Sequence, residues 1–219
     1  MSIPPDERLR LIEIYRSVQG ESTFAGLPCT FVRLAGCNLR CRWCDSEFTF
    51  TGGAHESIDA VIAEVARLGG TLVEITGGEP LVHRQAIPLM RRLVARGYTV
   101  LLETSGSRDI SEVPPEVHII LDLKPPDSGE ERANLWENLP LLKAKDEVKF
   151  VIASRRDYEW SLAAVLDHRL HERCAVLFSP VWGEVEPRDL AEWIVADGAP
   201  VRFQLQLHKV LWPADARGV

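Results

Sequence analysis

Cys37, Cys41 and Cys44 are separated by three and then by two residues, so that three thiols share one short segment. Thiolates are the usual ligands of iron–sulfur clusters, which normally take four of them. Three thiolates leave one iron without a protein ligand, and an open coordination position lets a metal centre bind and act on a substrate. The spacing therefore predicts a metal centre with an open site.

The other two cysteines, Cys29 and Cys174, are expected to be buried as small apolar residues, as free cysteines usually are. A structural zinc site is the alternative interpretation of the cluster, with Cys29 or His55 as the fourth ligand that such a site requires. An iron–sulfur cluster with an open iron indicates an enzyme, whereas structural zinc would indicate a binding module without catalysis.

Apolar strands and amphipathic helices alternate along the chain. The patterning predicts strands over residues 9–15, 30–35, 71–76, 98–103, 117–123, 147–153, 174–178 and 201–207, and helices over 57–68, 85–96, 156–170 and 187–196. Ser57 is expected to cap the first helix, Pro187 to begin the last, and residues 36–56 to form a loop. This order predicts an α/β fold of about six βα units around a parallel sheet, either doubly wound or a partial barrel.

Polar clusters follow four of the predicted strands. They read GCNLRCRWCD at 36–45, TGGEP at 76–80, ETSG at 103–106 and DLKPP at 122–126. In both candidate folds, ligands bind at the carboxyl ends of parallel strands. The four clusters are therefore expected to form one site.

Composition narrows the class of protein. The 219 residues carry a net charge of −7 with acidic and basic residues interspersed, which argues against a nucleic-acid partner. The N-terminus has no apolar targeting segment, and no stretch approaches the roughly 18 apolar residues of a membrane span. We expect a soluble, cytoplasmic protein with no membrane partner, in which residues 1–219 form a single domain.

Cys-x3-Cys-x2-Cys after one strand and Gly-Gly-Glu-Pro after the next resemble the radical S-adenosylmethionine (SAM) superfamily. The resemblance implies a partial (β/α) barrel of the radical SAM type, with about six parallel strands and a reduced helix set. It also implies a [4Fe–4S] cluster on the three cysteines, whose fourth iron chelates SAM, the source of a 5′-deoxyadenosyl radical. The implied SAM-binding residues are Trp43, Asp45, Gly77, Gly78, Glu79, Ser105, Asp122 and Lys124.

Further segments are similar to the 7-carboxy-7-deazaguanine synthase family. They are SVQGE at 17–21, FVRLAGCNL at 31–39, CDS at 44–46, QLHK at 206–209 and RGV at 217–219. The resemblance implies ring contraction of 6-carboxy-5,6,7,8-tetrahydropterin to 7-carboxy-7-deazaguanine with release of ammonia, in queuosine and related 7-deazapurine biosynthesis. It further implies Mg²⁺, a homodimer, and an external electron donor such as flavodoxin.

The same resemblance assigns roles by position. Ser46 would ligate Mg²⁺ through its hydroxyl, since Mg²⁺ prefers oxygen ligands. The implied substrate-binding residues are Val18, Gln19, Gly20, Glu21, Arg33, Thr76, His208 and Val219, the last through the terminal carboxylate. Asp122-Leu123-Lys124 departs from the family pattern, which more often reads Ser-Pro-Lys, so Asp122 stands where the family more often has serine.

Two rival functions remain at this point. A glycyl-radical-enzyme activase shares the cysteine spacing but acts on a protein loop, so an open groove would favour it. A zinc-stabilised binding module would be colourless, whereas a cysteine-ligated cluster absorbs broadly at about 400 nm.

Overall fold

One nine-stranded sheet organises residues 8–219, which are the residues that the computed structural model describes. Residues 1–7 lie outside the described residues. They include most of the N-terminal segment in which the sequence shows no apolar targeting signal. The strands are β1 (Arg8–Val18), β2 (Pro28–Leu34), β3 (Ala54–Ser57), β4 (Leu72–Gly77), β5 (Thr99–Thr104), β6 (His118–Leu123), β7 (Glu147–Ile152), β8 (Ala175–Pro180) and β9 (Arg202–Phe203).

The sheet has the order β3-β1-β2-β4-β5-β6-β7-β8-β9. From β2 to β9 all neighbouring strands are parallel, whereas β1 pairs antiparallel with both β2 and β3. The parallel part of the sheet thus has six full-length strands, β2 and β4 to β8, and a seventh, β9, of only two residues. Because β3 and β9 are its edges, the sheet does not close within residues 8–219, and the predicted partial barrel is confirmed.

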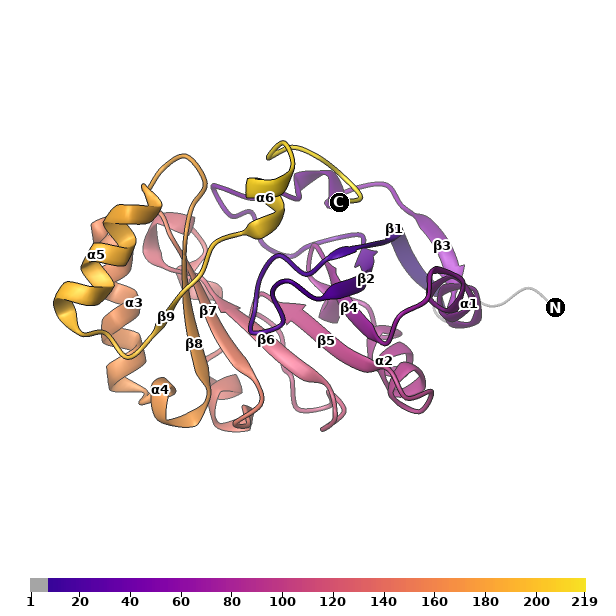
Figure 1. Ribbon diagram of the computed structural model, residues 1–219. Coiled ribbons are helices and arrows are strands. Elements are labelled where there is room, and N and C mark those ends of the chain that lie inside the picture. Colours follow the sequence, from indigo (N-terminus) through magenta and orange to yellow (C-terminus); the bar gives the residue numbers. More distant parts are fainter. Residues whose placement is uncertain (1–7) are drawn as a thin grey trace.

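All helices except the last pack on the outer face of this sheet. They are α1 (Ile58–Leu68), α2 (Ala86–Val94), α3 (Arg155–Asp167), α4 (Leu170–Arg173), α5 (Pro187–Asp197) and α6 (Leu207–Leu211). Figure 1 shows α1 and α2 beside one end of the sheet, α3 to α5 beside the other, and α6 near the C-terminus, away from both groups. The Ser57 hydroxyl caps α1 as predicted, by accepting a hydrogen bond of 3.1 Å from the Ala60 amide.

Alternation along the strands separates the core from the interior of the barrel. On β4, Val73 and Ile75 join the large apolar core that faces the helices, as successive strand residues point to opposite faces. Leu72 belongs to a smaller apolar cluster with Cys29, Phe31, Leu101 and Ile120. The inward positions nearer the strand ends are polar instead, which prepares that end of the barrel for a ligand.

Residues 201–207 do not form the predicted strand, and this expectation was wrong. Only Arg202–Phe203 pair with β8, and α6 begins at Leu207. The alternation was misleading because its polar residues are the buried ones. Gln204 and Gln206 are each 9% exposed and donate hydrogen bonds to Ser22 and Glu21, while Phe203 is 37% exposed.

Two smaller expectations also need correction. Residues 54–56 lie in the segment expected to be a loop, but together with Ser57 they form β3 on the edge of the sheet. The helix predicted over 156–170 ends at Asp167, and Arg169 takes a left-handed φ of 50° before the short α4. The other predicted strands and helices are confirmed, with Pro187 at the start of α5.

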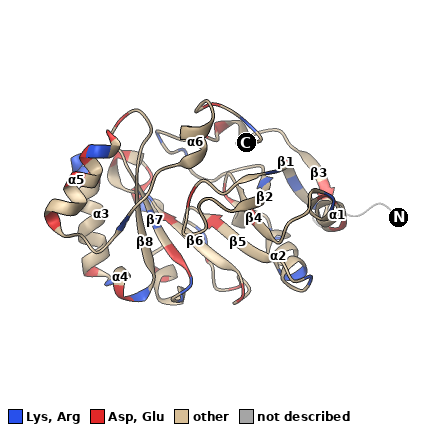
Figure 2. Ribbon diagram, viewed as in Figure 1, with Lys and Arg blue, Asp and Glu red and all other residues tan. Residues whose placement is uncertain are grey.

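Charged residues are dispersed over the molecule. Figure 2 shows acidic and basic segments interspersed along the sheet and the helices, with no continuous basic stretch on the ribbon. Among residues 8–219, no helix combines the length and the apolar character that crossing a membrane requires.

Candidate active site

Cys37, Cys41 and Cys44 follow β2 and line one cavity of about 560 Å³ at the carboxyl end of the parallel strands. All three are free thiols that are partly exposed. This volume falls in the range of about 300–1,000 Å³ that is usual for small-molecule sites. The three cysteines therefore share their cavity with room for a ligand.

Within residues 8–219, no three His, Cys, Asp or Glu side chains converge closely enough to hold a single metal ion. Tetrahedral zinc needs such convergence, whereas the thiolates of a [4Fe–4S] cluster each bind a different iron. The two candidate fourth ligands also lie elsewhere, since Cys29 is 1% exposed in an apolar cluster and His55 is exposed on β3. The donor set fits a cluster better than it fits zinc.

Gly77 and Gly78 bring the end of β4 against the cysteine segment. A Cβ atom on Gly77 would lie 2.2 Å from the Leu34 carbonyl oxygen, and Gly77 has a φ of +148°, which favours glycine. A Cβ atom on Gly78 would lie 2.2 Å from the Gly36 carbonyl oxygen and 2.8 Å from Cys37 Cβ. Only glycine permits this approach, which places backbone polar groups beside the cysteines.

Glu79 does not line the cavity, in contrast to the other seven predicted SAM-binding residues. Its side chain is fully buried, and each carboxylate oxygen accepts two hydrogen bonds. Oε1 accepts from Thr104 Oγ1 at 2.8 Å and Leu81 N at 3.0 Å, and Oε2 accepts from the Ser105 amide and hydroxyl at 2.8 and 2.6 Å. Glu79 thereby ties the end of β4 to the end of β5.

Asp122 and Lys124 lie on the cavity wall as an ion pair of 3.0 Å between Nζ and Oδ2. Burial alone would lower the pKa of Lys124, but Asp122 and Cys41 raise it above its usual value. Asp122 Oδ1 is buried and accepts no hydrogen bond from the described residues. A ligand with a donor group at this wall would satisfy it.

Trp43 completes this side of the cavity. Its ring packs against the small apolar cluster of Val151, Ala153 and Val181. The wall therefore combines a flat apolar surface with the Asp122–Lys124 pair, a combination that suits a ligand with both a ring and charged groups.

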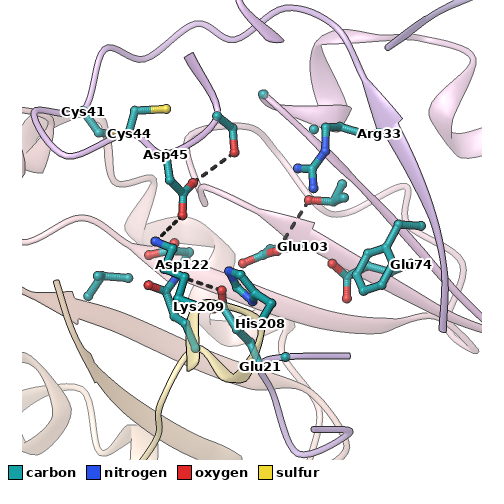
Figure 3. A pocket seen from close by; sticks show the side chains of 18 of the residues that line it. Glu21, Arg33, Cys41, Cys44, Asp45, Glu74, Glu103, Asp122, His208 and Lys209 are labelled. Atoms are coloured by element: carbon teal, nitrogen blue, oxygen red, sulfur yellow. Dashed lines mark hydrogen bonds and ion pairs between the residues drawn. The ribbon is translucent and has the colours of Figure 1, made fainter. Parts of the chain in front are cut away.

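Asp45 and Ser46 lie at the cavity beside the third cysteine, with Lys209 of α6 opposite them. The Ser46 hydroxyl donates to Asp45 Oδ1 at 3.0 Å, and Asp45 Oδ2 pairs with Lys209 Nζ at 2.7 Å. Burial alone would raise the pKa of Asp45, but Lys209 holds it well below its usual range. Figure 3 shows the Asp45–Lys209 pair across the cavity from Arg33, with Glu103 and His208 between them in this view.

All the predicted substrate-binding residues line the same cavity, although they come from both ends of the chain. Arg33 donates to Glu13 Oε1 at 2.9 Å and to the Tyr15 hydroxyl at 2.8 Å. Gly20 passes so close to His208 that a Cβ atom would lie 2.4 Å from its Nδ1. The cavity is therefore assembled by packing the first hairpin against α6.

The last residues of the chain form part of the cavity wall. Ala214, Ala216 and the segment 217–219 line it, and the Arg217 guanidinium stacks on the Phe48 ring at 4.0 Å. These residues reduce the open access that a protein loop would need.

Lys149 is a site residue that the sequence reasoning missed. It lies in the middle of β7, is 3% exposed, and lines the cavity. Its ammonium pairs with Glu21 Oε2 at 2.7 Å, with Glu103, and with Asp122 Oδ2 at 3.5 Å. A lysine within the apolar segment EVKFVI is the signal that could have identified it.

The pKa of Glu21 reflects this arrangement. Burial alone would raise it, but the Lys149 ammonium, His208 and the hydrogen bonds from Lys149 and Gln206 together lower it to about 2. Glu21 is therefore ionised at neutral pH, and Lys149 is the cation that makes its burial tolerable.

Glu74 is the second missed residue. Like Lys149, it is a charged residue within an apolar strand, here LVEITG, and this is the signal that could have identified it. It lines the cavity and is 3% exposed. Burial, Glu103 and Glu21 raise its pKa well above the usual value, and Lys149 and Arg33 oppose this only in part.

The sequence is similar to that of known enzymes. The radical SAM superfamily model matches residues 31–169. The 7-carboxy-7-deazaguanine synthase of Koribacter versatilis (strain Ellin345) is 48% identical over 96% of this chain and 100% of its own length. The enzyme of the same name from Chlorobaculum tepidum is 44% identical over 96% of this chain and 97% of its own.

The fold is similar to that of a solved structure. The crystal structure of QueE from Escherichia coli superposes with a TM-score of 0.70, at 26% sequence identity, covering 91% of this chain and 94% of that one.

Proposed function

The chain belongs to the radical SAM superfamily and, within it, to the 7-carboxy-7-deazaguanine synthase family, and from this premise we propose how its cavity is divided among its ligands. It catalyses the radical SAM ring contraction of 6-carboxy-5,6,7,8-tetrahydropterin to 7-carboxy-7-deazaguanine with release of ammonia, in 7-deazapurine biosynthesis. The observation that carries this function is that the three cysteines and the polar residues of the first hairpin line one cavity. The resemblance drawn from the motifs is confirmed.

The enzyme uses a [4Fe–4S] cluster and SAM, which supply the radical chemistry when bound. We propose that Cys37, Cys41 and Cys44 hold the cluster. The proposed SAM subsite is lined by Trp43, Asp45, Gly77, Gly78, Ser105, Asp122 and Lys124. Glu79 supports this subsite indirectly, since its four hydrogen bonds fix Ser105 and the strand ends.

Ser46 is the proposed Mg²⁺ ligand. Its hydroxyl faces the cavity next to the Asp45 carboxylate, and oxygen donors of this kind suit Mg²⁺. The substrate carboxylate and water would complete the coordination. Bound there, the ion would orient the substrate and stabilise its negative charge.

The proposed substrate subsite lies between the first hairpin and α6. Arg33 would bind the substrate carboxylate, for which a guanidinium is well shaped, and the Glu13 and Tyr15 contacts hold it in place. Gln19, Glu21, Thr76, His208 and the Val219 carboxylate would contact the pterin, with Val18 and Gly20 giving the ring room. The C-terminal segment would exclude water from the radical step.

Several properties of the whole protein belong to the same proposal. We propose that residues 1–219 act as a single radical SAM domain in the cytoplasm and that the protein is a homodimer. An external donor such as flavodoxin would supply the electron. Light scattering should give a particle of twice the mass of one chain, and the mass of one chain would contradict the dimer.

Anaerobic turnover tests the function directly. Reconstituted protein with reductant, SAM and Mg²⁺ should convert 6-carboxytetrahydropterin into a product that is lighter by one ammonia, as read by mass spectrometry. Cys41→Ala should give no product. SAM cleavage that proceeds without a pterin-derived product would contradict the assignment, and a radical transferred to a protein would favour the activase.

The Mg²⁺ site has its own test. Ser46→Ala should weaken the dependence of turnover on Mg²⁺ while leaving SAM cleavage possible. Ser111→Ala changes an exposed serine outside the cavity and serves as the matched control. An identical Mg²⁺ titration in wild type and Ser46→Ala would remove Ser46 from the site.

A further inference from the structure

Glu74 is a buried carboxyl group that the proposed reaction leaves without a role. Its strand, β4, directs Val73 and Ile75 into the core, so Glu74 points to the opposite face and lines the cavity. Thr76 lies two residues further along the same face, and the register pairs Arg33 with Thr76. Glu74 therefore lies one inward layer below Arg33, the residue proposed for the substrate carboxylate.

The partners of Glu74 do not neutralise it. It accepts one hydrogen bond, from the Gln19 amide nitrogen, and it forms no ion pair with any of residues 8–219. Glu21 and Glu103, by contrast, both pair with Lys149. A buried carboxyl group without a cation destabilises a protein, so its presence in a ligand cavity points to a function.

The neighbours of Glu74 also fix its orientation. Gln19 donates to Glu74 through its amide nitrogen, while its amide oxygen accepts from the Glu21 backbone at 2.8 Å. The Gln19 amide is therefore fixed at both ends. One side of the Glu74 carboxyl group is held by Gln19, and the rest of it forms no ion pair with residues 8–219.

A ligand edge with two adjacent N–H donors complements a carboxyl group, because its two oxygens accept parallel hydrogen bonds. The pterin ring carries such an edge, formed by its 2-amino group and the neighbouring ring N–H. This edge lies at the opposite end of the bicycle from the substrate carboxylate. With the carboxylate at Arg33 near the strand end, the amino edge would point inward, toward the layer of Glu74.

We propose that Glu74 is a specificity-determining residue that binds the 2-amino edge of the pterin substrate. This proposal rests on the proposed function, because it places that substrate in the cavity. Burial, Glu103 and Glu21 raise the pKa of Glu74 in the protein without a ligand, and two N–H donors from the pterin would lower it by stabilising the ionised carboxylate.

The test compares two substrates in two proteins. The second substrate is the 2-oxo analogue, in which a carbonyl oxygen replaces the 2-amino group. Wild type should discriminate against it by about 10⁴-fold in kcat/KM, since a site built for an N–H donor rejects an analogue that lacks it. Glu74→Gln should lower kcat/KM for the pterin by about 10- to 100-fold, as expected for a hydrogen bond to a charged group.

The diagnostic quantity is the ratio of the two kcat/KM values. A glutamine offers the 2-oxo group an N–H donor, so the ratio should fall by at least about 100-fold in Glu74→Gln. A purely structural role would lower both activities together and leave the ratio unchanged. Glu147→Gln removes another buried carboxylate, one that binds Thr23 outside the cavity, and should keep the wild-type ratio.

The outcomes separate the two proposals. Wild type that converts the pterin, together with an unchanged ratio in Glu74→Gln, would overturn the role of Glu74 and leave the proposed function intact. Wild type that converts neither compound, while still cleaving SAM, would overturn both. Retention of the cluster absorbance in Glu74→Gln would show that the variant folds and keeps its cluster, so that the ratio can be interpreted.

Discussion

Replacing Lys149 by methionine should destabilise the protein strongly, because this lysine is the shared cation of a buried acidic group. Its side chain is 4% exposed and contacts Glu21, Glu103 and Asp122. Methionine fills a similar volume, so the change removes mainly the charge. Breaking a buried pair by removing one partner costs about 3–5 kcal/mol, as it leaves uncompensated charge behind.

The pKa of Glu21 gives an independent magnitude. It lies at about 2 instead of 4.5, although burial alone would raise it. That difference corresponds to about 3 kcal/mol in favour of the ionised carboxylate, much of it owed to Lys149. The cost of breaking a buried ion pair and the pKa shift of Glu21 agree in magnitude. The free energy of unfolding of Lys149→Met should therefore fall by about 3 kcal/mol or more at neutral pH.

The pH dependence follows from the sign of the shift. A lowered folded-state pKa stabilises wild type above the unfolded pKa of 4.5, and this stability is lost as the pH falls toward about 2. Without Lys149, burial raises the pKa of Glu21 instead, so the variant is penalised at neutral pH and relieved as the carboxylate takes up a proton. The deficit of Lys149→Met should therefore shrink between pH 7.5 and about pH 5.

Anaerobic urea unfolding at these two pH values, followed by tryptophan fluorescence, measures the deficit. Lys143→Met is the matched control, because Lys143 is an exposed lysine whose replacement should change the stability by about 0.5 kcal/mol or less. A loss below about 1 kcal/mol, or one that is equal at both pH values, would refute the electrostatic role given to Lys149.

Three further changes test other parts of the site. Cys29→Ala should keep the absorbance at about 400 nm of the reconstituted cluster and Cys41→Ala should lose it; a loss in Cys29→Ala would make Cys29 a ligand. Gly78→Ala should lower the bound iron per chain, because its Cβ would lie 2.2 Å from a carbonyl oxygen of the cysteine segment, and wild-type iron content would show that the close approach is dispensable. Glu79→Gln should lower the free energy of unfolding by about 2 kcal/mol, because the glutamine NH2 group would face the N–H and O–H groups of Thr104 and Ser105 and cannot accept their hydrogen bonds. An unchanged denaturation midpoint would disprove this structural role.

The sequence was sufficient for features that depend on neighbouring residues. Cysteine spacing, the glycine pair at 77–78 and the Ser57 cap are local, and their physical requirements can be read from a few positions. The strand-end clusters also met as expected, because parallel strands carry their carboxyl ends to one edge of a sheet. Together these features were enough to predict the superfamily, and the longer motifs narrowed it to one reaction.

The local pattern gave a wrong prediction where polar residues are buried and apolar residues are exposed. In 201–207 alternation predicted a strand, yet the structure buries Gln204 and Gln206 and exposes Phe203, because the glutamines bond to the loop after β1. Glu79 is a second residue whose partners the local sequence did not predict. Its motif suggested a ligand contact, while its position between two strand ends turned its carboxylate to the chain itself.

The three thiols and their spacing were thus determined by the sequence alone, as was the alternation that gives each strand two faces. Only the tertiary structure decided which face lines the cavity. It placed Lys149 beside Glu21, 128 residues earlier in the chain, and left Glu74 without an ion pair among residues 8–219. The physical reason is that alternation fixes the direction of a side chain relative to its neighbours, whereas its electrostatic partners depend on how distant strands curve around a common interior.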